Sequence, residues 1–414
     1  MSNKTLIVIQ PQLGVGGIED YFVKLMAGCV RLGCKVYWLC DSDRYVYCGY
    51  KQEMAGVEVV PFRSEHLHRL RTIKVPIEPD SEVAIVCAYS KFLIYAEELI
   101  EKQKLRNANA FYLMPHFEGY KQFPEEAFRG RLNRYIGNRY KKIIDCWIQR
   151  NQILFFAKKH ALVLQEHYSL TIPDVDKRLV PSVWESPRFD SEKTNKKARG
   201  RSSMFLIATA ARFEFPHKGY IIGLIHAFSK LLESFPQVKL LLIGDGPNRN
   251  EIEECVNQQN AATRDAIELK GYLSPTELER ELGLAQLIIG VAGSLLAGAR
   301  QGTLSLPVRH YTYELESPGY LSCSSDEGSL VVSPCEDAYS YIENAITMPD
   351  SDYCRLSYDS YLAAIPEPPD YYYFFTHSNK RSIDALSKSE RRFTKIVFRI
   401  ANAVTFIKTR YGRE

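Results

Sequence analysis

The chain has 414 residues, of which 45% are hydrophobic and 25% are charged, a composition typical of globular proteins that excludes disordered and fibrous chains. This length predicts two domains. The formal net charge is only +4, whereas a nucleic-acid-binding protein needs a strong basic bias in at least one domain, so we expect no nucleic-acid partner.

The cysteines and the apolar runs indicate where the protein works. The ten cysteines are scattered without a C-x-x-C pair, which predicts reduced, mostly structural thiols. The apolar run near Met1 is too short for a signal peptide, and no stretch reaches the roughly 18 apolar residues of a transmembrane helix. We therefore expect a cytoplasmic protein whose contact with the inner face of the cell membrane is peripheral.

Short apolar runs alternate with helical patterns in the first half of the chain. A strand at residues 6–9 leads through a glycine-rich turn into a helix whose apolar residues recur at helical spacing as far as Cys29. Further strands are predicted at residues 35–40, 57–62, 83–87 and 110–114, with a helix at 95–104 between the last two. This alternation is typical of a parallel sheet covered by helices on both faces, so residues 1–190 are predicted to form a Rossmann-like domain.

The same alternation begins again after a polar, lysine-rich stretch at residues 190–203, which is predicted to be an interdomain linker or a surface loop. Strands follow at residues 205–208, 238–243, 267–269 and 287–291, and helices at 221–232, 251–256 and 277–282. Residues 203–375 are therefore predicted to form a second Rossmann-like domain. Two such α/β domains predict a ligand cleft between them.

A glycine cluster follows the first predicted strand. Gly14 and Gly16 open a helix as in a dinucleotide-binding fingerprint, but Glu19 stands where the third glycine belongs, which argues against a nicotinamide or flavin cofactor. At a helix start, Gly16 and Gly17 let backbone amides approach an anion or a sugar closely. The alternative is a tight turn without a ligand.

Two cations lie in the predicted loop between the strand at 205–208 and the helix at 221–232. Arg212 and Lys218 are placed near the start of that helix. A guanidinium group and the positive end of a helix act together on a diphosphate, so this loop is a candidate diphosphate site. The alternative is that both cations are solvated surface charges.

The order of several motifs resembles the family 4 retaining glycosyltransferases, whose GT-B fold has two Rossmann-like domains, a donor cleft between them and a last helix that crosses back to the first domain. The motifs are Gly16-Gly17-Ile-Glu19, Arg212 to Lys218-Gly219, Leu241-Leu-Ile-Gly-Asp-Gly-Pro247, Lys270-Gly-Tyr-Leu273, and Ala285-Gln-Leu-Ile-Ile-Gly-Val with Gly302. The resemblance covers most of the chain and is most specific in residues 205–310. It implies an acceptor domain followed by a nucleotide-sugar domain, and sugar transfer with retained anomeric configuration and without a metal ion or other cofactor.

The resemblance also implies roles for individual residues. Arg212 and Lys218 match the pair that stabilises charge on the leaving diphosphate, and His116 takes about the position of a histidine that contacts the donor sugar. These three are the expected catalytic residues, although a lone histidine is more often structural. The expected donor-binding residues are Gly16 and Gly17 near the sugar and phosphate, Tyr272 and Leu273 near the base, and Gly244, Gly293, Ser294 and Ala297.

Ala297 departs from the family pattern. It aligns with a glutamate that binds the ribose hydroxyls, and the other glutamate of the family's pair is also missing. Either the site is a natural variant, or the chain was altered to trap an inactive form. The alignment places residue 297 at the start of a helix that faces the cleft, so Ala297→Glu is expected to strengthen donor binding.

Two basic stretches predict contact with an anionic membrane surface. Residues 129–142 are rich in arginine and lysine, although an ordinary helix packed in the first domain is the alternative. In residues 380–414, helical spacing predicts a basic amphipathic helix. Its apolar arc consists of Phe393, Ile396, Val397, Ile400, Val404 and Ile407, and its basic arc of Arg391, Arg392, Lys395, Arg399 and Arg410. The resemblance implies that the apolar arc packs on the first domain, which leaves the basic arc free for lipid headgroups.

The sequence thus predicts a retaining glycosyltransferase that moves a sugar from a nucleotide-sugar donor to a glycan or lipid-linked acceptor in surface-polysaccharide biosynthesis, such as that of capsule or O-antigen. Two alternatives stay open. One is a catalytically impaired, glycosyltransferase-like partner subunit, which Ala297 favours. The other is a sugar-nucleotide epimerase of the same fold, which needs acidic groups in the cleft; no convincing pair is present.

Overall fold

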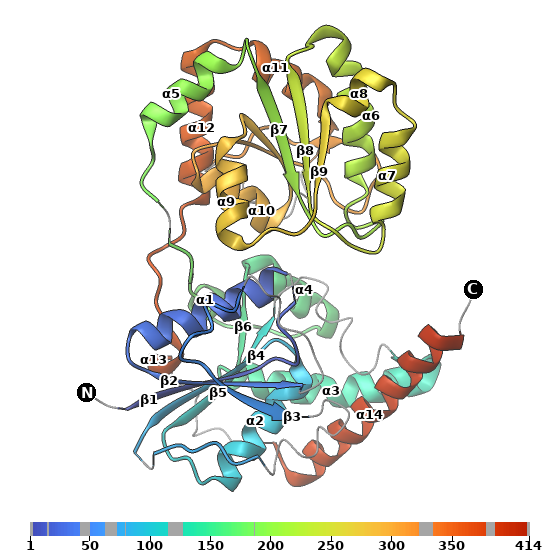
Figure 1. Cartoon of the computed structure of the whole chain (residues 1–414). Coiled ribbons are helices and arrows are strands. Elements are labelled where there is room, and N and C mark those ends of the chain that lie inside the picture. Colours follow the sequence, from blue (N-terminus) through green and yellow to red (C-terminus); the bar gives the residue numbers. More distant parts are fainter. Residues whose placement is uncertain are drawn as a thin grey trace. The chain divides into compact units, whose positions relative to one another are not determined.

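The computed structural model of the chain divides into two compact units (Figure 1). The first unit comprises Met1–Trp184 and Pro368–Glu414, and the second comprises Glu185–Glu367. The structure describes residues 3–14, 16–41, 50–62, 73–78, 80–114, 127–185, 187–322, 334–377 and 386–411, with side chains described as far as 401. His116 lies outside these ranges.

The first unit is built on a parallel sheet with strand order β3-β2-β1-β4-β5-β6. Its strands are β1 (Lys4–Ile9), β2 (Lys35–Asp41), β3 (Glu58–Phe62), β4 (Glu82–Cys87), β5 (Ala108–Met114) and β6 (Ile153–Phe155). After β1 the chain adds β2 and β3 on one side of it, and then β4, β5 and β6 on the other side. The topological switch point therefore lies between β1 and β4, where ligands of such sheets bind beyond the carboxyl ends of the strands.

Helices cover both faces of this sheet, which is why its strands are nearly continuous apolar runs. Ile7 and Ile85 join the buried cluster on one face, and Leu6 and Val86 join the cluster on the other. The helices of the first face are α2 (Ser90–Lys102), α3 (Gly130–Gln149), α4 (Lys158–Tyr168) and α14 (Lys388–Tyr411), and those of the second are α1 (Gly17–Arg31) and α13 (Tyr373–Thr376). A 3-10 helix, Val175–Arg178, follows α4.

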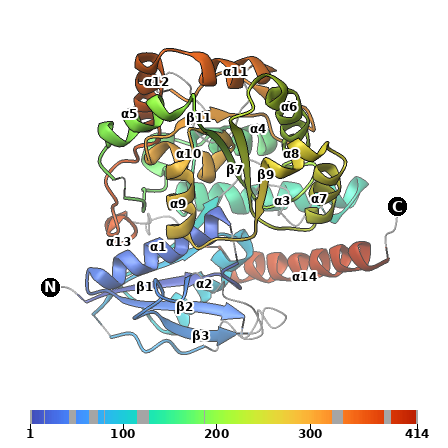
Figure 2. The same ribbon diagram turned by 45° about the horizontal axis from the view of Figure 1, so that its top comes forward.

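The second unit has a parallel sheet of order β11-β10-β7-β8-β9, of which Figure 2 labels β11, β7 and β9. Its switch point lies between β7 and β10. The strands are β7 (Phe205–Ala210), β8 (Val238–Ile243), β9 (Ile267–Lys270), β10 (Leu287–Gly290) and β11 (Leu304–Pro307), with a separate antiparallel pair, β12 (Glu316–Ser317) and β13 (Glu336–Asp337). One face packs on α6 (Tyr220–Ser234), α7 (Arg249–Asn257), α8 (Ala261–Asp265) and α11 (Tyr339–Thr347), and the other on α9 (Pro275–Leu284), α10 (Ala292–Arg300) and α12 (Asp350–Ala364).

The predicted fold class is confirmed. The chain forms two parallel sheets with helices on both faces, and α14 packs back on the first unit. The prediction of a linker or loop at residues 190–203 is wrong. These residues include α5 (Ser191–Gly200), which belongs to the second unit. Asp190 caps the helix by accepting a hydrogen bond from the backbone N–H of Lys193, and the buried Lys197 donates to Thr303 Oγ1 at 2.6 Å. The composition did not predict this packing face, because lysine counts as a polar residue even where its aliphatic stem is buried.

The prediction for the two arcs of the C-terminal helix is wrong in part. Ile396 and Ile400, expected to pack, are 45% and 47% exposed, and Arg391, expected to be free, is buried. The reason is that Glu101 of α2 faces α14 and pairs with Arg391, which turns that side of the helix inward. Among the described residues, no helix is long and apolar enough to span a membrane.

Candidate functional site

The switch point of the second unit brings together two loops that sequence reasoning placed in the site. β7 and β10 are parallel neighbours, so the loop after β7 and the loop after β10 start from the same edge of the sheet. The first carries Arg212 and Lys218, and the second leads through Val291 into α10, whose first turn contains Gly293 and Ser294. Ligands of open α/β sheets bind at such an edge.

The loop after β7 is held in shape by the loop after β8. The backbone N–H of Phe213 donates to Asp245 O at 2.9 Å, the N–H of Asn248 donates to Phe213 O at 3.1 Å, and the N–H of Phe215 donates to Asn248 Oδ1 at 2.8 Å. These bonds hold the backbone directly after Arg212. The arginine is therefore presented from a fixed loop, which lowers the entropy lost on binding a ligand.

Gly244 has a structural reason to be glycine. Its φ of +140° lies in the range that side chains rarely adopt, and a Cβ at this position would lie 1.9 Å from Ala211 O. The glycine therefore allows the loop after β8 to lie directly against the loop that carries Arg212. Its contribution to a ligand site is through this packing.

Arg212 and Lys218 have different surroundings. The Arg212 side chain is exposed, and its Nε lies 3.4 Å from Glu214 Oε2. Lys218 is half-buried, and loss of hydration lowers its pKa to about 8, with the charge of Glu214 acting in the opposite direction. Within the described part of the chain, Lys218 forms no ion pair. An anion placed beside both cations would compensate this desolvated charge.

Tyr272 lies close to Arg212. It follows β9, is exposed, and donates its hydroxyl hydrogen to Asp245 O at 2.8 Å. Partial burial raises the pKa of Tyr272, and the positive charge of Arg212 opposes this shift, which places the two side chains near each other. Leu273 instead packs against the buried cluster under α9 and α10. Of this predicted pair, Tyr272 therefore offers an exposed aromatic ring at the site.

The amino terminus of α10 is open. Gly293 is exposed with nothing within 4 Å of a Cβ built on it, and the Ser294 hydroxyl donates to Val291 O at 3.4 Å. No acidic residue lies in the first turn and no side chain caps it. Ala292 has a φ of +53°, a left-handed conformation that is uncommon for alanine. The first amides of α10 are thus available to an oxygen-rich ligand at the switch point.

Ala297 does not lie at the start of a helix as expected. It lies in the second turn of α10, is only 8% exposed, and belongs to the buried cluster that includes Leu282 and Leu295. The methyl group of Ala297 therefore contributes to packing between α10 and its neighbours.

The switch point of the first unit contains the glycine loop with Glu19, and two residues that sequence reasoning missed, Gln10 and Lys91. Gly17 begins α1, and a Cβ built there would have nothing within 4 Å. Gln10, directly after β1, is buried and lies 3.5 Å from Glu19 through its Nε2. Lys91, in the first turn of α2, lies 5.4 Å from the ring centre of Tyr89, and burial lowers its pKa.

These residues were missed because their place depends on strand order. β4 lies beside β1, so the start of α2 and the glycine loop meet at one edge. A sequence pattern that starts the helix at residue 95 leaves Lys91 in an unassigned loop. Gly16 has an extended backbone, and a Cβ there would meet only the flexible Glu19 side chain, at 2.3 Å from Oε2. Gly17 therefore leaves open space at this edge, whereas the space beside Gly16 is occupied by the Glu19 side chain.

Comparison with solved structures establishes the fold. HepE from Anabaena, in complex with UDP and glucose, matches with a TM-score of 0.57 and 11% identity over 91% of this chain and 98% of its own. A glycosyltransferase from Rickettsia africae matches with a TM-score of 0.54 and 13% identity, over 97% and 99% of the two chains. WaaG, a glycosyltransferase involved in lipopolysaccharide biosynthesis, matches with a TM-score of 0.51 and 13% identity, over 95% and 99%. The chain therefore has the GT-B fold of two Rossmann-like domains. No family model and no curated protein matches it.

Proposed function

We propose that the protein is a retaining glycosyltransferase that moves a sugar from a nucleotide-sugar donor to a glycan or lipid-linked acceptor in surface-polysaccharide biosynthesis. The observation that carries the proposal is Lys218, a desolvated lysine without an ion pair in the described residues, on the same loop as Arg212 at the switch point of the second unit. Such a pair suits a diphosphate. The GT-B fold and its glycosyltransferase neighbours support this assignment.

The proposed mechanism assigns the leaving group to the second unit. Arg212 and Lys218 hold the two phosphates and stabilise the charge that grows on the leaving oxygen as the bond to the sugar breaks. The amides at the start of α10 add partial positive charge, and Tyr272 offers its ring to the base. These groups act without a metal ion in this proposal. Among the described residues, no group of three or more histidine, cysteine or acidic side chains is placed to hold one.

The proposed role of the first unit is to hold the acceptor and the sugar. Its switch point provides the open backbone at Gly17 and the polar side chains of Gln10, Glu19 and Lys91. His116, which the resemblance places beside the donor sugar, stays a prediction outside the described residues. We place the reaction at the cytoplasmic face of the membrane, where the protein would meet a lipid-linked acceptor.

A panel of nucleoside diphosphates and their sugars tests the proposed function. A donor that binds only the folded protein raises its melting temperature with concentration. We expect one base to stand out, with UDP the first to try because HepE was crystallised with it. The matching UDP-sugars then serve as substrates, and release of UDP that depends on an added glycan or lipid-linked acceptor shows transfer. No stabilisation by any nucleotide would contradict the proposal.

A second candidate is a glycosyltransferase-like partner subunit without activity of its own. It is favoured by Ala297, which places a methyl group in an apolar cluster where the resemblance expects a ribose-binding carboxylate. This candidate predicts weak nucleotide binding and no sugar transfer under any condition. An epimerase of the same fold would instead convert the nucleotide-sugar without acceptor, so product analysis of the same reactions separates all three.

A further inference from the structure

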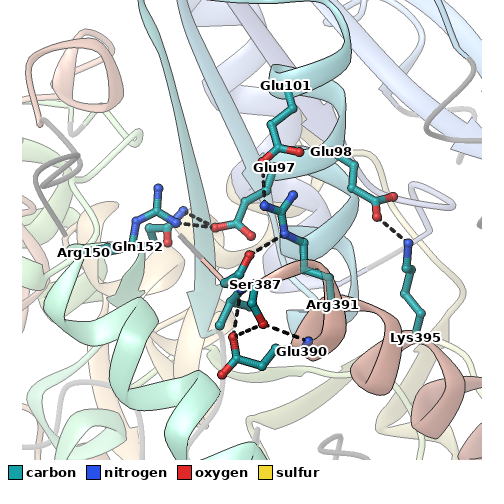
Figure 3. Close-up of polar contacts among 10 residues, drawn as sticks. Glu97, Glu98, Glu101, Arg150, Gln152, Ser387, Glu390, Arg391 and Lys395 are labelled. Carbon is teal, nitrogen blue, oxygen red and sulfur yellow. Dashed lines mark hydrogen bonds and ion pairs between the residues drawn. The ribbon is translucent and has the colours of Figure 1, made fainter. Parts of the chain in front are cut away.

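Helix α14 is fixed at its start, so it presents a defined surface. Figure 3 shows that Ser387 and Glu390 form a capping box: the backbone N–H of Glu390 donates to Ser387 Oγ at 3.2 Å, and the N–H of Ser387 donates to Glu390 Oε2 at 2.8 Å. Farther along, Thr394, Val397 and Phe398 are buried against the first unit. The opposite side of the helix is therefore held outward.

Two cations of α14 neutralise the acidic residues of α2 (Figure 3). Arg391 Nη2 lies 2.5 Å from Glu101 Oε1, and Lys395 pairs with Glu98. The bond to Arg391 is the main reason why the pKa of Glu101 lies below its ordinary value, so this carboxylate is charged and paired at neutral pH. The acidic groups on this side of α2 are thus already occupied by α14.

Four further cations line the groove between the two helices without such partners. The groove has a volume of about 570 Å³ and is lined on the α14 side by Lys388, Arg392 and Arg399, and on the α2 side by Lys102. None of these four forms an ion pair with a carboxylate that the structure describes. All four are exposed. The groove therefore carries uncompensated positive charge, which is complementary to phosphate.

Exposed apolar side chains border this basic groove. Ile396 lines it, and Ile400 lies one turn farther along the same side of α14. On α3, Leu132 and Tyr135 are also exposed, and the Tyr135 ring contacts the Phe393 ring of α14 at a centroid distance of 6.4 Å. Large apolar side chains among unpaired cations are the pattern of a helix that lies in the headgroup layer of an anionic membrane.

We propose that the groove between α2 and α14 binds the phosphates of anionic lipid headgroups, while Ile396 and Ile400 insert among the lipids. This inference rests on the proposed function only for the membrane location and not for sugar transfer. It assigns the contact to the side of α14 that exposes both isoleucines and Arg392, whereas Arg391 and Lys395 stay engaged with α2. The headgroup phosphate, rather than a nucleic acid or an acidic protein, is the occupant because the cations lie beside exposed apolar residues.

Vesicle co-sedimentation of the full chain tests this surface. We expect binding to vesicles that contain phosphatidylglycerol and little binding to phosphatidylcholine alone. The double variant Arg392→Gln/Arg399→Gln is expected to weaken binding about tenfold or more, because each cation near an anionic surface contributes on the order of 1 kcal/mol. Ile396→Ser/Ile400→Ser is expected to weaken binding to a similar degree. Lys230→Gln/Lys239→Gln removes the same charge from exposed positions of the second unit and serves as the matched control.

Equal binding to neutral and anionic vesicles, wild-type binding by both α14 double variants, or an equal loss in the control would each overturn the inference. Tighter binding to a short RNA than to the anionic vesicles would also overturn it, in favour of a polyanion site. The melting temperature and the affinity for UDP are measured on each variant. If the protein binds UDP but not the vesicles, this inference fails and the proposed function stands. If it binds the vesicles but no nucleotide, the result counts against the proposed function.

Discussion

The two switch points use glycine in different ways. In the second unit, Gly244 lies against the backbone of Ala211 in a conformation that side chains rarely adopt, and this contact shapes the loop that carries Arg212. In the first unit, Gly17 begins α1 with open space around it. One glycine is therefore required by the fold, whereas the other has open space beside it and no packing reason to be glycine. Similar glycine-rich turns in a sequence can thus have different physical causes.

The largest effect is expected from substituting the glycine that the fold requires. Gly244→Ala places a methyl group against a backbone oxygen at a positive φ, so the free energy of unfolding should fall by at least about 3 kcal/mol. Gly17→Ala is the matched control, and its unfolding free energy should stay within about 1 kcal/mol of wild type. Denaturant unfolding of both variants measures this difference. Equal losses in the two variants would remove the contrast between the loops.

Next in size are the two cations of the second unit. Arg212→Gln and Lys218→Gln should each weaken UDP binding by about tenfold to a hundredfold, since a charge-assisted hydrogen bond contributes on the order of 1.5 to 3 kcal/mol. Lys91→Gln removes a half-buried lysine from the corresponding edge of the first unit and should leave UDP affinity unchanged. Titration calorimetry of the three variants gives the comparison. If only Lys91→Gln weakened UDP binding, the diphosphate site would instead lie in the first unit.

A smaller effect is expected at Ala297. The sequence led us to expect tighter donor binding from Ala297→Glu, whereas the buried position predicts a lower melting temperature, because a carboxylate would enter an apolar cluster. We expect a loss of about 1 to 3 kcal/mol in unfolding free energy. Ala297→Gln separates the cost of charge from the cost of size. Unchanged stability together with faster turnover of a UDP-sugar would support the original expectation instead.

The smallest predicted effect is a pH dependence that comes from Lys218. Its pKa of about 8 means that the unliganded protein loses this proton as the pH rises above 8, so UDP affinity should fall by up to about tenfold per pH unit until the pKa of the complex is reached. Without ligand the sign is opposite: the pKa is below that of an unfolded lysine, so its cost to folding is relieved as the pH rises. Calorimetry in the weakly alkaline range measures the first effect. Lys218→Arg should flatten the profile, and a profile that it leaves unchanged would exclude Lys218 as the cause.

The sequence was sufficient for the sheets and for the cationic loop. Strands such as β8, Val238–Ile243, are buried between helices on both faces and therefore read as apolar runs, and the loop after β7 follows from its place between a strand and an amphipathic helix. Contacts between distant segments were not readable. Arg391 is buried because Glu101 faces it, and α5 packs through Lys197. Both side chains are charged, so the sequence predicted that they are exposed to solvent. The place of Lys91 beside the glycine loop could be recognised only from the strand order.

The central claim is that the second unit binds the diphosphate of a nucleotide through Arg212, Lys218 and the start of α10 without a metal ion. Titration of UDP into the full chain in excess chelator, with and without added magnesium or manganese afterwards, tests it most directly. The account predicts that UDP binds in chelator and that added metal leaves its affinity unchanged. It also predicts that the double variant Arg212→Gln/Lys218→Gln abolishes UDP binding. Binding that vanishes in chelator and returns with the metal, or that survives in the double variant, would contradict it.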